Sequence, residues 1–500
     1  MPRSLSTRPL RAALALGAAA AVLTGCAAVG PNFKPPAPPA SDSYAQASDG
    51  ANHGDMQAEV GAKVVADWWT LFHSPALDTV VRQAIAGSPT LDEARARLAA
   101  AREEVKAESG LVTVDANAGF ERERSNLYAF SGGAFKPNAL AGFSFPTNPE
   151  FNLFTLGGTV GYNFDLFGQV RRTREALKAD AEAQARELDA AYLTLTGQVV
   201  AQALTIADAN VQIAALQDIV TSDQADLEIV RKARAAGGAT AADEAGVEAE
   251  LAQDAAAIPA EQQRLAAARH QMAVLVGKTP SQYDPPDFNA GSGSLPMRLP
   301  VSLPSELAHG RPDILEAEAQ LHAATARIGV ATAALYPNIT LSGSITQNAL
   351  TPSQIFAPIA NGWAIGPTVS APIFHSGELQ AKKREAQDQA RAALDAYEQT
   401  VLAAFAQVDD ALQAIAHDSD AYEEQSRALD AATSRLEMVR RGYRAGGVSA
   451  LQLVDAERTW RRTRLALSQE ITGRYGDAAR LLMATASVPP GVAEAKPPTP

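Results

Sequence analysis

The sequence VRKARAAGGATAADEAGVE at residues 230–248 returns in altered form as VRRGYRAGGVSALQLVDAE at residues 439–457, an offset of 209 positions. The identical pairs are Val230/Val439, Arg231/Arg440, Ala236/Ala445, Gly237/Gly446, Gly238/Gly447, Ala241/Ala450 and Glu248/Glu457. An earlier pair of blocks, Ser-Pro-Thr-Leu at 88–91 and Arg-Pro-Asp-Ile at 311–314, corresponds at an offset of 223 positions. Because two blocks recur in the same order, the chain contains one long unit twice, which predicts a pseudo-symmetric protomer.

Long helices are predicted on both sides of each Ala-Gly-Gly. Spacings of four and three residues, which predict coiled-coil packing, link Leu188, Tyr192, Leu195, Val199, Gln202, Ile206, Ala209, Ile213, Leu216 and Val220. A similar pattern runs through Leu394, Tyr397, Val401, Phe405, Val408, Leu412 and Ile415. The uninterrupted stretch 169–234 would extend roughly 100 Å as a helix. Glycine allows the left-handed conformation that ends a helix, so returning helices are expected at about 239–277 and 449–486, and shorter helices at about 75–110 and 312–335.

Each copy also contains two segments in which apolar and polar residues alternate. We expect strands at about 112–122 and 155–166 in the first copy, and at about 337–346 and 362–373 in the second. Strands of about ten residues with one apolar face are typical of outer-membrane barrels, although a soluble β-sandwich has the same pattern. Loops rich in Gly, Pro and Asn separate each pair, at 125–152 and 347–361, as expected of extracellular loops. These loops therefore favour an outer-membrane barrel over a soluble β-sandwich.

Four strands are too few for a closed barrel, because small transmembrane barrels have at least eight and lipid does not tolerate open sheet edges. The chain is therefore predicted to oligomerise, and three copies would supply twelve strands. Beyond the N-terminal region we find no run of 18 apolar residues, so no transmembrane helix is expected. Any crossing of the membrane would then be made by strands.

The N-terminal region is typical of a lipoprotein signal. Three arginines precede an apolar run at 12–23, which is too short to span a bilayer but typical of a secretory signal. Leu23-Thr24-Gly25-Cys26 follows and contains the single cysteine of the chain. It resembles the lipobox at which the signal, residues 1–25, is removed and the cysteine is lipidated; a buried core cysteine is the alternative. A Pro/Ala/Ser-rich linker at 26–60 would follow the anchored Cys26.

Composition and motifs exclude several functions. The formal net charge of −13 argues against nucleic acid as a partner. The seven histidines are scattered without an H-E-x-x-H motif, and neither a Gly-rich phosphate loop nor a G-x-S-x-G elbow is present. We therefore expect no enzyme activity, no cofactor and no metal site.

The order of these features resembles the TolC-type outer membrane factors, and most closely their lipidated NodT/OprM-like branch. The specific pieces are Trp68-Trp69-x-x-Phe72, Arg311-Pro312-Asp313-Ile314, Ala334-Leu335-Tyr336-Pro337-Asn338-Ile339 and the block from Arg440 to Glu457. The resemblance implies a mainly α fold with a membrane β-barrel: duplicated helical hairpins form a periplasmic α-barrel, and a homotrimer completes twelve strands. The implied divisions are a first repeat at 61–277, an equatorial linker at 278–304, a second repeat at 305–486 and a tail at 487–500.

The same resemblance implies an exit duct in the outer membrane that extends into the periplasm. It would pass small molecules or drugs from a periplasmic adaptor protein and an inner-membrane pump, of the resistance–nodulation–division type, without any cofactor. Two alternatives stay open. One is a conduit for type I protein secretion, and the other is a non-conducting lipoprotein tether, which would not explain the four alternating strands.

Within the family, residues just after the second Gly-Gly turn set the periplasmic constriction. The matching positions are Leu451, which would form an apolar ring in the trimer, and Asp455, which would form an acidic ring that favours cations. Gln452 stands where some members have a second aspartate. Tyr443 matches a tyrosine that latches helix pairs. The alternatives are that Leu451 packs inside the hairpin and that Asp455 is an ordinary solvated helix residue.

The two hairpin turns are also the expected docking points for the adaptor. The turn residues are Gly237, Gly238, Gly446 and Gly447, and the candidate polar contacts are Arg231, Arg440 and Arg444.

Overall fold

The computed structural model describes residues 28–37, 44, 56–62, 64–108, 111–124, 150–288, 295–296 and 298–488. The signal, Cys26, most of the linker at 26–60, most of the first loop and nearly all of the tail lie outside the described residues. The chain forms two compact units, which we name the strand unit (1–34, 102–180 and 321–393) and the hairpin unit (35–101, 181–320 and 394–500). Each unit draws on both sequence repeats.

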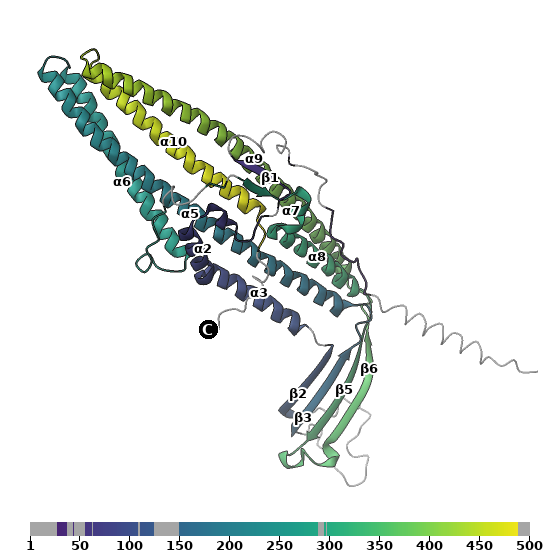
Figure 1. The fold of residues 1–500 in the computed structure, drawn as a ribbon. Helices are drawn as coiled ribbons and strands as arrows, with labels where there is room; N and C mark the ends of the chain where they lie inside the picture. Colours follow the sequence, from purple (N-terminus) through teal and green to yellow (C-terminus); the bar gives the residue numbers. More distant parts are fainter. Residues whose placement is uncertain are drawn as a thin grey trace, which may run out of the picture. The chain divides into compact units, whose positions relative to one another are not determined.

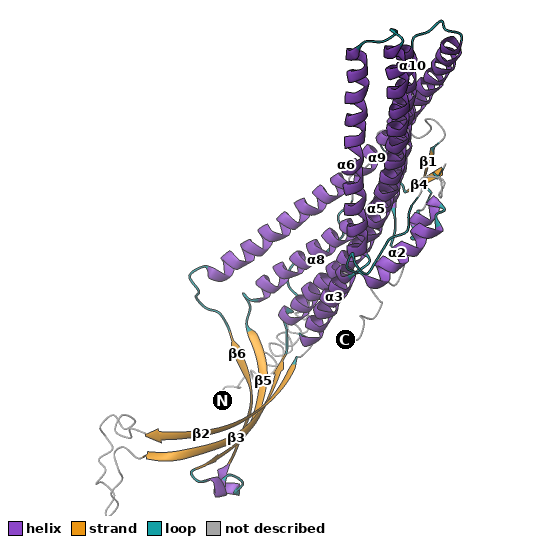
Figure 2. Cartoon of the chain, turned by 90° about the vertical axis from the view of Figure 1, so that its left-hand side faces the viewer, coloured by secondary structure: helices purple, strands orange, loops and turns teal. Residues whose placement is uncertain are grey.

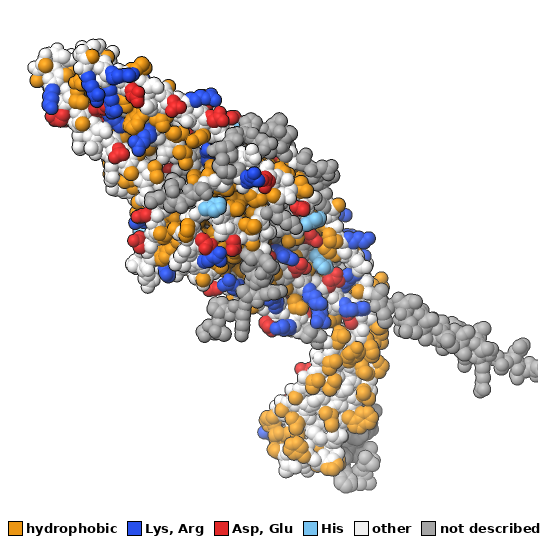
Figure 3. Space-filling model, viewed as in Figure 1, with side chains coloured by type: hydrophobic (Ala, Val, Ile, Leu, Met, Phe, Trp, Pro, Cys, Tyr) orange, Lys and Arg blue, Asp and Glu red, His pale blue; other side chains and the backbone are white. Residues whose placement is uncertain are grey.

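The strand unit contains a four-stranded antiparallel sheet in the order β2-β3-β5-β6 (Figure 2). The strands are β2 (Val112–Arg124), β3 (Glu150–Asn163), β5 (Asn338–Ala349) and β6 (Asn361–Ser370). β3 pairs with β5, with Gly158 opposite Ile345, so both repeats contribute to one sheet. The sheet face visible in Figure 3 carries mainly hydrophobic and uncharged side chains. Among the described strands, β2 and β6 form the two edges, and each edge needs a further partner in lipid.

Two strands differ in extent from the prediction. The strand expected at 155–166 occupies Glu150–Asn163, because the chain turns at Asp165, whose φ is 45°. The Asp165 carboxylate accepts hydrogen bonds from the backbone N–H groups of Val170 and Arg171, at 2.9 and 3.0 Å, and so caps the following helix. The strand expected at 362–373 ends at Ser370. Pro367 lies within β6, opposite Leu341 of β5.

The helix expected at 75–110 is in fact two helices, α2 (Pro75–Gly87) and α3 (Pro89–Ala107). Ser88 between them is extended, with φ −73° and ψ 118°. A residue before proline avoids the helical region because the proline ring clashes with it. The single-helix prediction was therefore wrong at the Ser88-Pro89 step. The other shorter helices are α7 (Pro304–Gly310) and α8 (Pro312–Ala333), and the 3₁₀ turns are η2 (Pro352–Gln354) and η3 (Pro358–Ala360).

Two long helical hairpins run side by side in the hairpin unit (Figure 1). The first joins α5 (Gln169–Ala235) to α6 (Ala241–Leu275), and the second joins α9 (Glu378–Arg444) to α10 (Ala450–Thr485). Of the predicted heptad positions on α5, these are buried: Leu188, Tyr192, Leu195, Val199, Ile206, Ala209 and Leu216. Five of them share one core cluster with Val408, Leu412 and Ile415 of α9: Leu188, Tyr192, Leu195, Val199 and Ile206. The heptad pattern therefore predicted the packed face correctly.

The same core includes the Trp68-Trp69-x-x-Phe72 motif and two short strands that the sequence patterns did not predict. The 3₁₀ turn η1 (Trp68–Phe72) buries both of its tryptophans almost completely. Beside it, β1 (Gln57–Val60) pairs in parallel with β4 (Arg298–Val301). Strands of four residues show too little alternation to be recognised in a sequence.

By length and composition, one described helix, α5, is long and apolar enough to cross a membrane. Its most apolar window of 18 residues has a mean hydropathy of 1.4, and half of that window is buried within the chain. The heptad residues of α5 explain this burial, since they pack against α9 and α10 in the core. We therefore regard α5 as a core helix.

Candidate functional site

The two hairpin turns share one backbone design. Gly237 and Gly446 adopt left-handed φ angles of 79° and 74°. The N–H groups of Gly238 and Gly447 then bond back to the carbonyls of Ala233 and Gly442, at 2.8 and 3.0 Å. This arrangement ends a helix in the Schellman manner, for which glycine is suited because it has no Cβ. All four glycines are exposed.

A capping box begins each returning helix. Thr240 exchanges hydrogen bonds with Asp243, and Ser449 does the same with Gln452. The Gln452 amide oxygen accepts the Ser449 backbone N–H at 3.0 Å. Gln452 therefore satisfies a free helix-end donor, as the Asp243 carboxylate does in the first hairpin.

Leu451 is half-buried within its own chain. It packs against a small cluster formed by Leu227 and Val230 of α5, Val247 of α6 and Val454 of α10. Leu451 therefore helps to join the two hairpins.

Asp455 lies one turn further along α10 and its side chain is 58% exposed. Its carboxylate forms an ion pair with Arg435 of α9. Each acidic group in a ring of Asp455 side chains would therefore have a cationic neighbour from its own chain. Tyr443, the predicted latch residue, is 37% exposed near the end of α9.

The arginines near the turns differ in how they are held. Arg231 and Arg234 both bond to Glu244, and Arg440 bonds to Glu457 through two nitrogens at 3.0 and 2.9 Å. Arg444 is exposed and forms no ion pair with any residue that the structure describes. Figure 3 shows basic side chains gathered over the hairpins near these ends. Arg444 is consequently the predicted contact residue with the most accessible charge.

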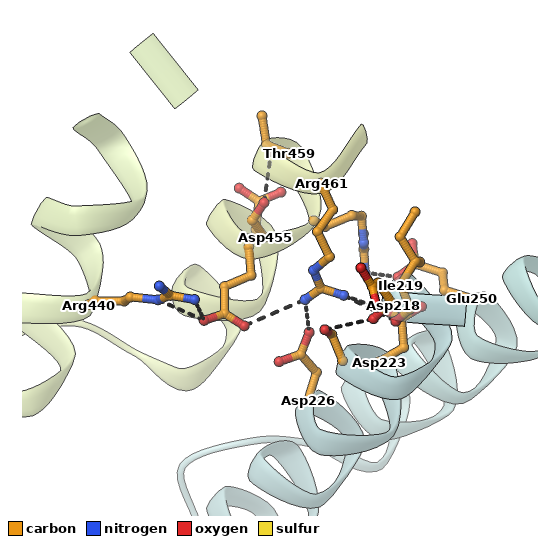
Figure 4. A network of polar contacts seen from close by, with 12 residues as sticks. Asp218, Ile219, Asp223, Asp226, Glu250, Arg440, Asp455, Thr459 and Arg461 are labelled. Atoms are coloured by element: carbon orange, nitrogen blue, oxygen red, sulfur yellow. Dashed lines mark hydrogen bonds and ion pairs between the residues drawn. The ribbon is translucent and has the colours of Figure 1, made fainter. Parts of the chain in front are cut away.

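A buried ion-pair network links the two hairpins about three turns from the tip (Figure 4). Arg461 of α10 donates to Asp223 at 2.8 Å and to Asp226 at 2.6 Å, both on α5. It also contacts Glu457, one turn back on α10, at 3.5 Å. The side chains of Arg461, Asp223 and Asp226 are only 9%, 9% and 3% exposed. A second cross-hairpin ion pair joins Arg458 of α10 to Glu250 of α6.

Burial changes the acidity of this network. It raises the pKa of the Asp226 carboxyl to about 6, against the opposing effect of Arg461. Burial also raises the pKa of Asp223, and the nearby carboxyl of Asp254 acts in the same direction. The Asp226 carboxyl therefore takes up a proton at a higher pH than an exposed aspartate does.

Sequence reasoning missed Arg461, Asp223 and Asp226 because charges on helices are usually solvated. A signal was nevertheless present. The heptad spacing that includes the buried Leu216 continues through Val220 to position 223, where the residue is aspartate. An ionisable residue on the buried stripe of a helix needs a partner from another helix.

Comparison with known proteins identifies the family. The model of the family described as "Outer membrane efflux protein" matches residues 80–278 and 303–486, which is more than half of the chain. The chain belongs to this family. The match treats the two sequence repeats as two copies of one family unit, and it confirms the resemblance to TolC-type outer membrane factors.

Relatives of this efflux channel protein have similar lengths. "Nodulation protein T" of Rhizobium leguminosarum bv. trifolii is 27% identical over 452 residues, which is 90% of this chain and 92% of that protein. "Pyoverdine export outer membrane protein OpmQ" of Pseudomonas putida is 29% identical over 415 residues, 80% and 85% of the two chains. The solved structure of the outer-membrane channel OprN superposes with a TM-score of 0.79 at 27% identity, covering 92% of this chain and 99% of that one.

These findings confirm the predicted fold class, location and general function. The protein is an outer membrane efflux channel protein that extends into the periplasm, and its fold is that of the TolC-like channels. Its family consists of channel proteins and not of enzymes. Membership of the family also implies a trimer that works within a tripartite system.

Proposed function

We propose that three copies of this chain form the exit duct for small molecules of a tripartite efflux system driven by a resistance–nodulation–division pump. The observation that carries the proposal is the four-stranded sheet with edges at β2 and β6, in a chain of the efflux channel family. Pairing β6 of one copy with β2 of the next removes every open edge, as lipid requires. The relative OpmQ is named for export of pyoverdine, which supports a small-molecule cargo.

Single-channel conductance tests the duct. Purified trimer in planar bilayers is expected to show a small, cation-selective conductance. Absence of conductance from correctly inserted protein would favour the tether instead. Co-purification with a resistance–nodulation–division pump supports drug efflux, whereas an ATP-binding-cassette exporter as partner would favour the secretion conduit.

We also propose that contacts between the two hairpins of each protomer hold the resting duct closed. Leu451 and Asp455 would line the aperture, with Tyr443 as a latch. Arg461 would hold the hairpins together behind them, because it is the buried cation shared by α10 and α5. While the hairpins are together, Arg461 compensates the two buried carboxylates of Asp223 and Asp226, so its loss would destabilise the closed state.

The hairpin turns, with Gly237, Gly238, Gly446 and Gly447 at their ends, are the proposed docking points of the adaptor. Arg444 and Arg440 would contact it, and Arg444 is the better candidate because Arg440 already bonds to Glu457. Charge reversal, Arg444→Glu, is expected to weaken capture of the adaptor more than Arg440→Glu. If both variants captured the adaptor equally well, the adaptor would not dock through Arg444 at this turn.

Lipidation of Cys26 after removal of residues 1–25 is a further part of the proposal. A thioether-linked diacylglycerol with an acylated amine would anchor the chain firmly, since two or more acyl chains are needed for stable attachment. Metabolic labelling with palmitate is expected to mark the parent protein and not the Cys26→Ser variant. Label in both would remove Cys26 as the acceptor.

A further inference from the structure

The segment just after Cys26 is bound tightly to the strand unit. We name residues 28–34 the strap. The Val29 backbone N–H donates to the Phe167 carbonyl at 3.1 Å. Arg172, in the first turn of α5, donates from Nε to the Val29 carbonyl at 3.1 Å. Its Nη2 donates to the Gly30 carbonyl at 3.3 Å and to Asn32 Oδ1 at 2.8 Å.

Arg172 is the centre of these contacts and is only 3% exposed. Its remaining terminal nitrogen, Nη1, donates to Glu175 at 2.7 Å. The other Glu175 oxygen lies 3.2 Å from His322 Nε2, and the His322 ring stacks on Phe33 of the strap at 4.4 Å. A buried guanidinium is stable only when its donors are satisfied. Three of the four donor contacts go to the strap, so Arg172 and the strap depend on each other.

The backbone of the strap also packs closely against the strand unit. Gly30 has a φ of 94°, and a Cβ there would lie 2.5 Å from Gly329 Cα on α8. A Cβ on Gly168 would lie 2.5 Å from Ala28, and one on Gly329 would lie 2.7 Å from the Arg172 side chain. Real Cβ atoms do not approach other atoms this closely. Glycine at these three positions therefore allows the strap to lie directly against the start of α5 and against α8.

We propose that Arg172, Glu175, His322, Gly168 and Gly329 form a binding site for the strap, and that this strap site fixes the lipid anchor to the junction of strands and helices. Cys26 precedes Ala28 by two residues, so the chain keeps the two within about 7 Å. Phe167, which accepts the strap's first hydrogen bond, stacks on Tyr336 at 4.6 Å, just before β5. The anchor thus becomes a fixed part of the protomer and is not a loose tether. The part about lipid rests on the proposed lipidation of Cys26.

A spin label on the strap tests the site. Lys34 is exposed, so Lys34→Cys carries the label on full-length trimer, and lipidated Cys26 offers no free thiol. The label is expected to be immobilised in the parent and to move at least tenfold faster in Arg172→Gln. The matched control is Arg174→Gln, an exposed arginine two residues along the same helix, which should leave the label immobilised. A mobile label in the parent, or one unchanged by Arg172→Gln, would overturn the proposal.

A second variant guards against misfolding of Arg172→Gln. Gly30→Ala alters the strap alone, and its added methyl meets both a left-handed φ and the Gly329 backbone. We expect it to free the label while the trimer stays intact; an immobilised label in Gly30→Ala would count against the proposed fit.

The mass of the mature parent reports lipidation separately. If lipid is absent, the proposed lipidation fails together with the inferred role in placing the anchor. The label spectra of a parent with Cys26→Ser still decide whether the strap site exists.

Discussion

Arg461→Met is the substitution for which the structure makes the sharpest prediction. The guanidinium is shared by two carboxylates of the neighbouring hairpin, at 2.8 and 2.6 Å, and all three side chains are at most 9% exposed. Methionine has a similar length and carries no charge, so it removes the ion pairs with little change in packing. Asp223 and Asp226 are then left buried without their cation.

The expected loss of stability of the closed state follows from the missing ion pairs and from protonation of the carboxyls. Removing one partner of a buried ion pair costs about 3–5 kcal/mol. Protonation limits the loss: Arg461 lowers the pKa of the buried Asp226, so without it burial raises that pKa further and the carboxyl takes up a proton more readily, which places the cost at the low end of this range. We therefore expect about 3 kcal/mol. If that energy holds the hairpins together in the resting duct, the closed-to-open ratio falls about 100-fold.

Planar-bilayer recordings of single trimers measure this ratio directly. Arg461→Met should convert brief openings into long ones, whereas Arg462→Met, an exposed neighbour on the same helix, should behave as the parent. Replacing the two aspartates by asparagine as well should restore closure, because no buried charge is then left unpaired. Parent-like gating of Arg461→Met, in protein shown to be trimeric, would refute the reasoning that this buried pair holds the duct closed.

Three further outcomes are expected. When the hairpins are together, the pKa of Asp226 is raised above that of an exposed aspartate, so the closed state binds a proton more readily than the open state. The closed state should therefore become more stable as pH falls from about 7 to 5. Asp226→Asn should weaken this pH dependence in the same recordings. Asp455→Ala should raise conductance and sensitise cells to large antibiotics, and unchanged behaviour in both assays would remove this residue from the gate. Gly446→Ala places a side chain at a φ of 74° and should lower the free energy of unfolding by about 1–2 kcal/mol, while Gly447→Ala, which lacks a positive φ, should cost less. Equal losses in thermal unfolding would show that the left-handed φ of Gly446 does not require glycine.

Local patterns in the sequence predicted much of the fold. The heptad spacing identified the buried face of α5, and the Ala-Gly-Gly blocks located both hairpin turns, because helix packing and helix termination leave regular traces along a chain. Alternation located the four long strands to within a few residues. The prediction failed where one residue decides a boundary, as at Ser88 before Pro89 and at Asp165, and where β1 and β4 pair across more than two hundred residues.

Periodicity and ordered motifs were enough to predict the duplication, the helical hairpins, the membrane-type strands and the family. Which charges are buried, and which groups they pair with, became visible only in the folded chain. Arg461 and Asp223 lie 238 positions apart, and Arg172 and the strap about 140. A buried charge must find its counter-charge or its acceptors wherever the fold places them. The spacing of residues along the chain does not reveal such a pair, because the pair is needed only once folding has placed both groups in the low-dielectric core.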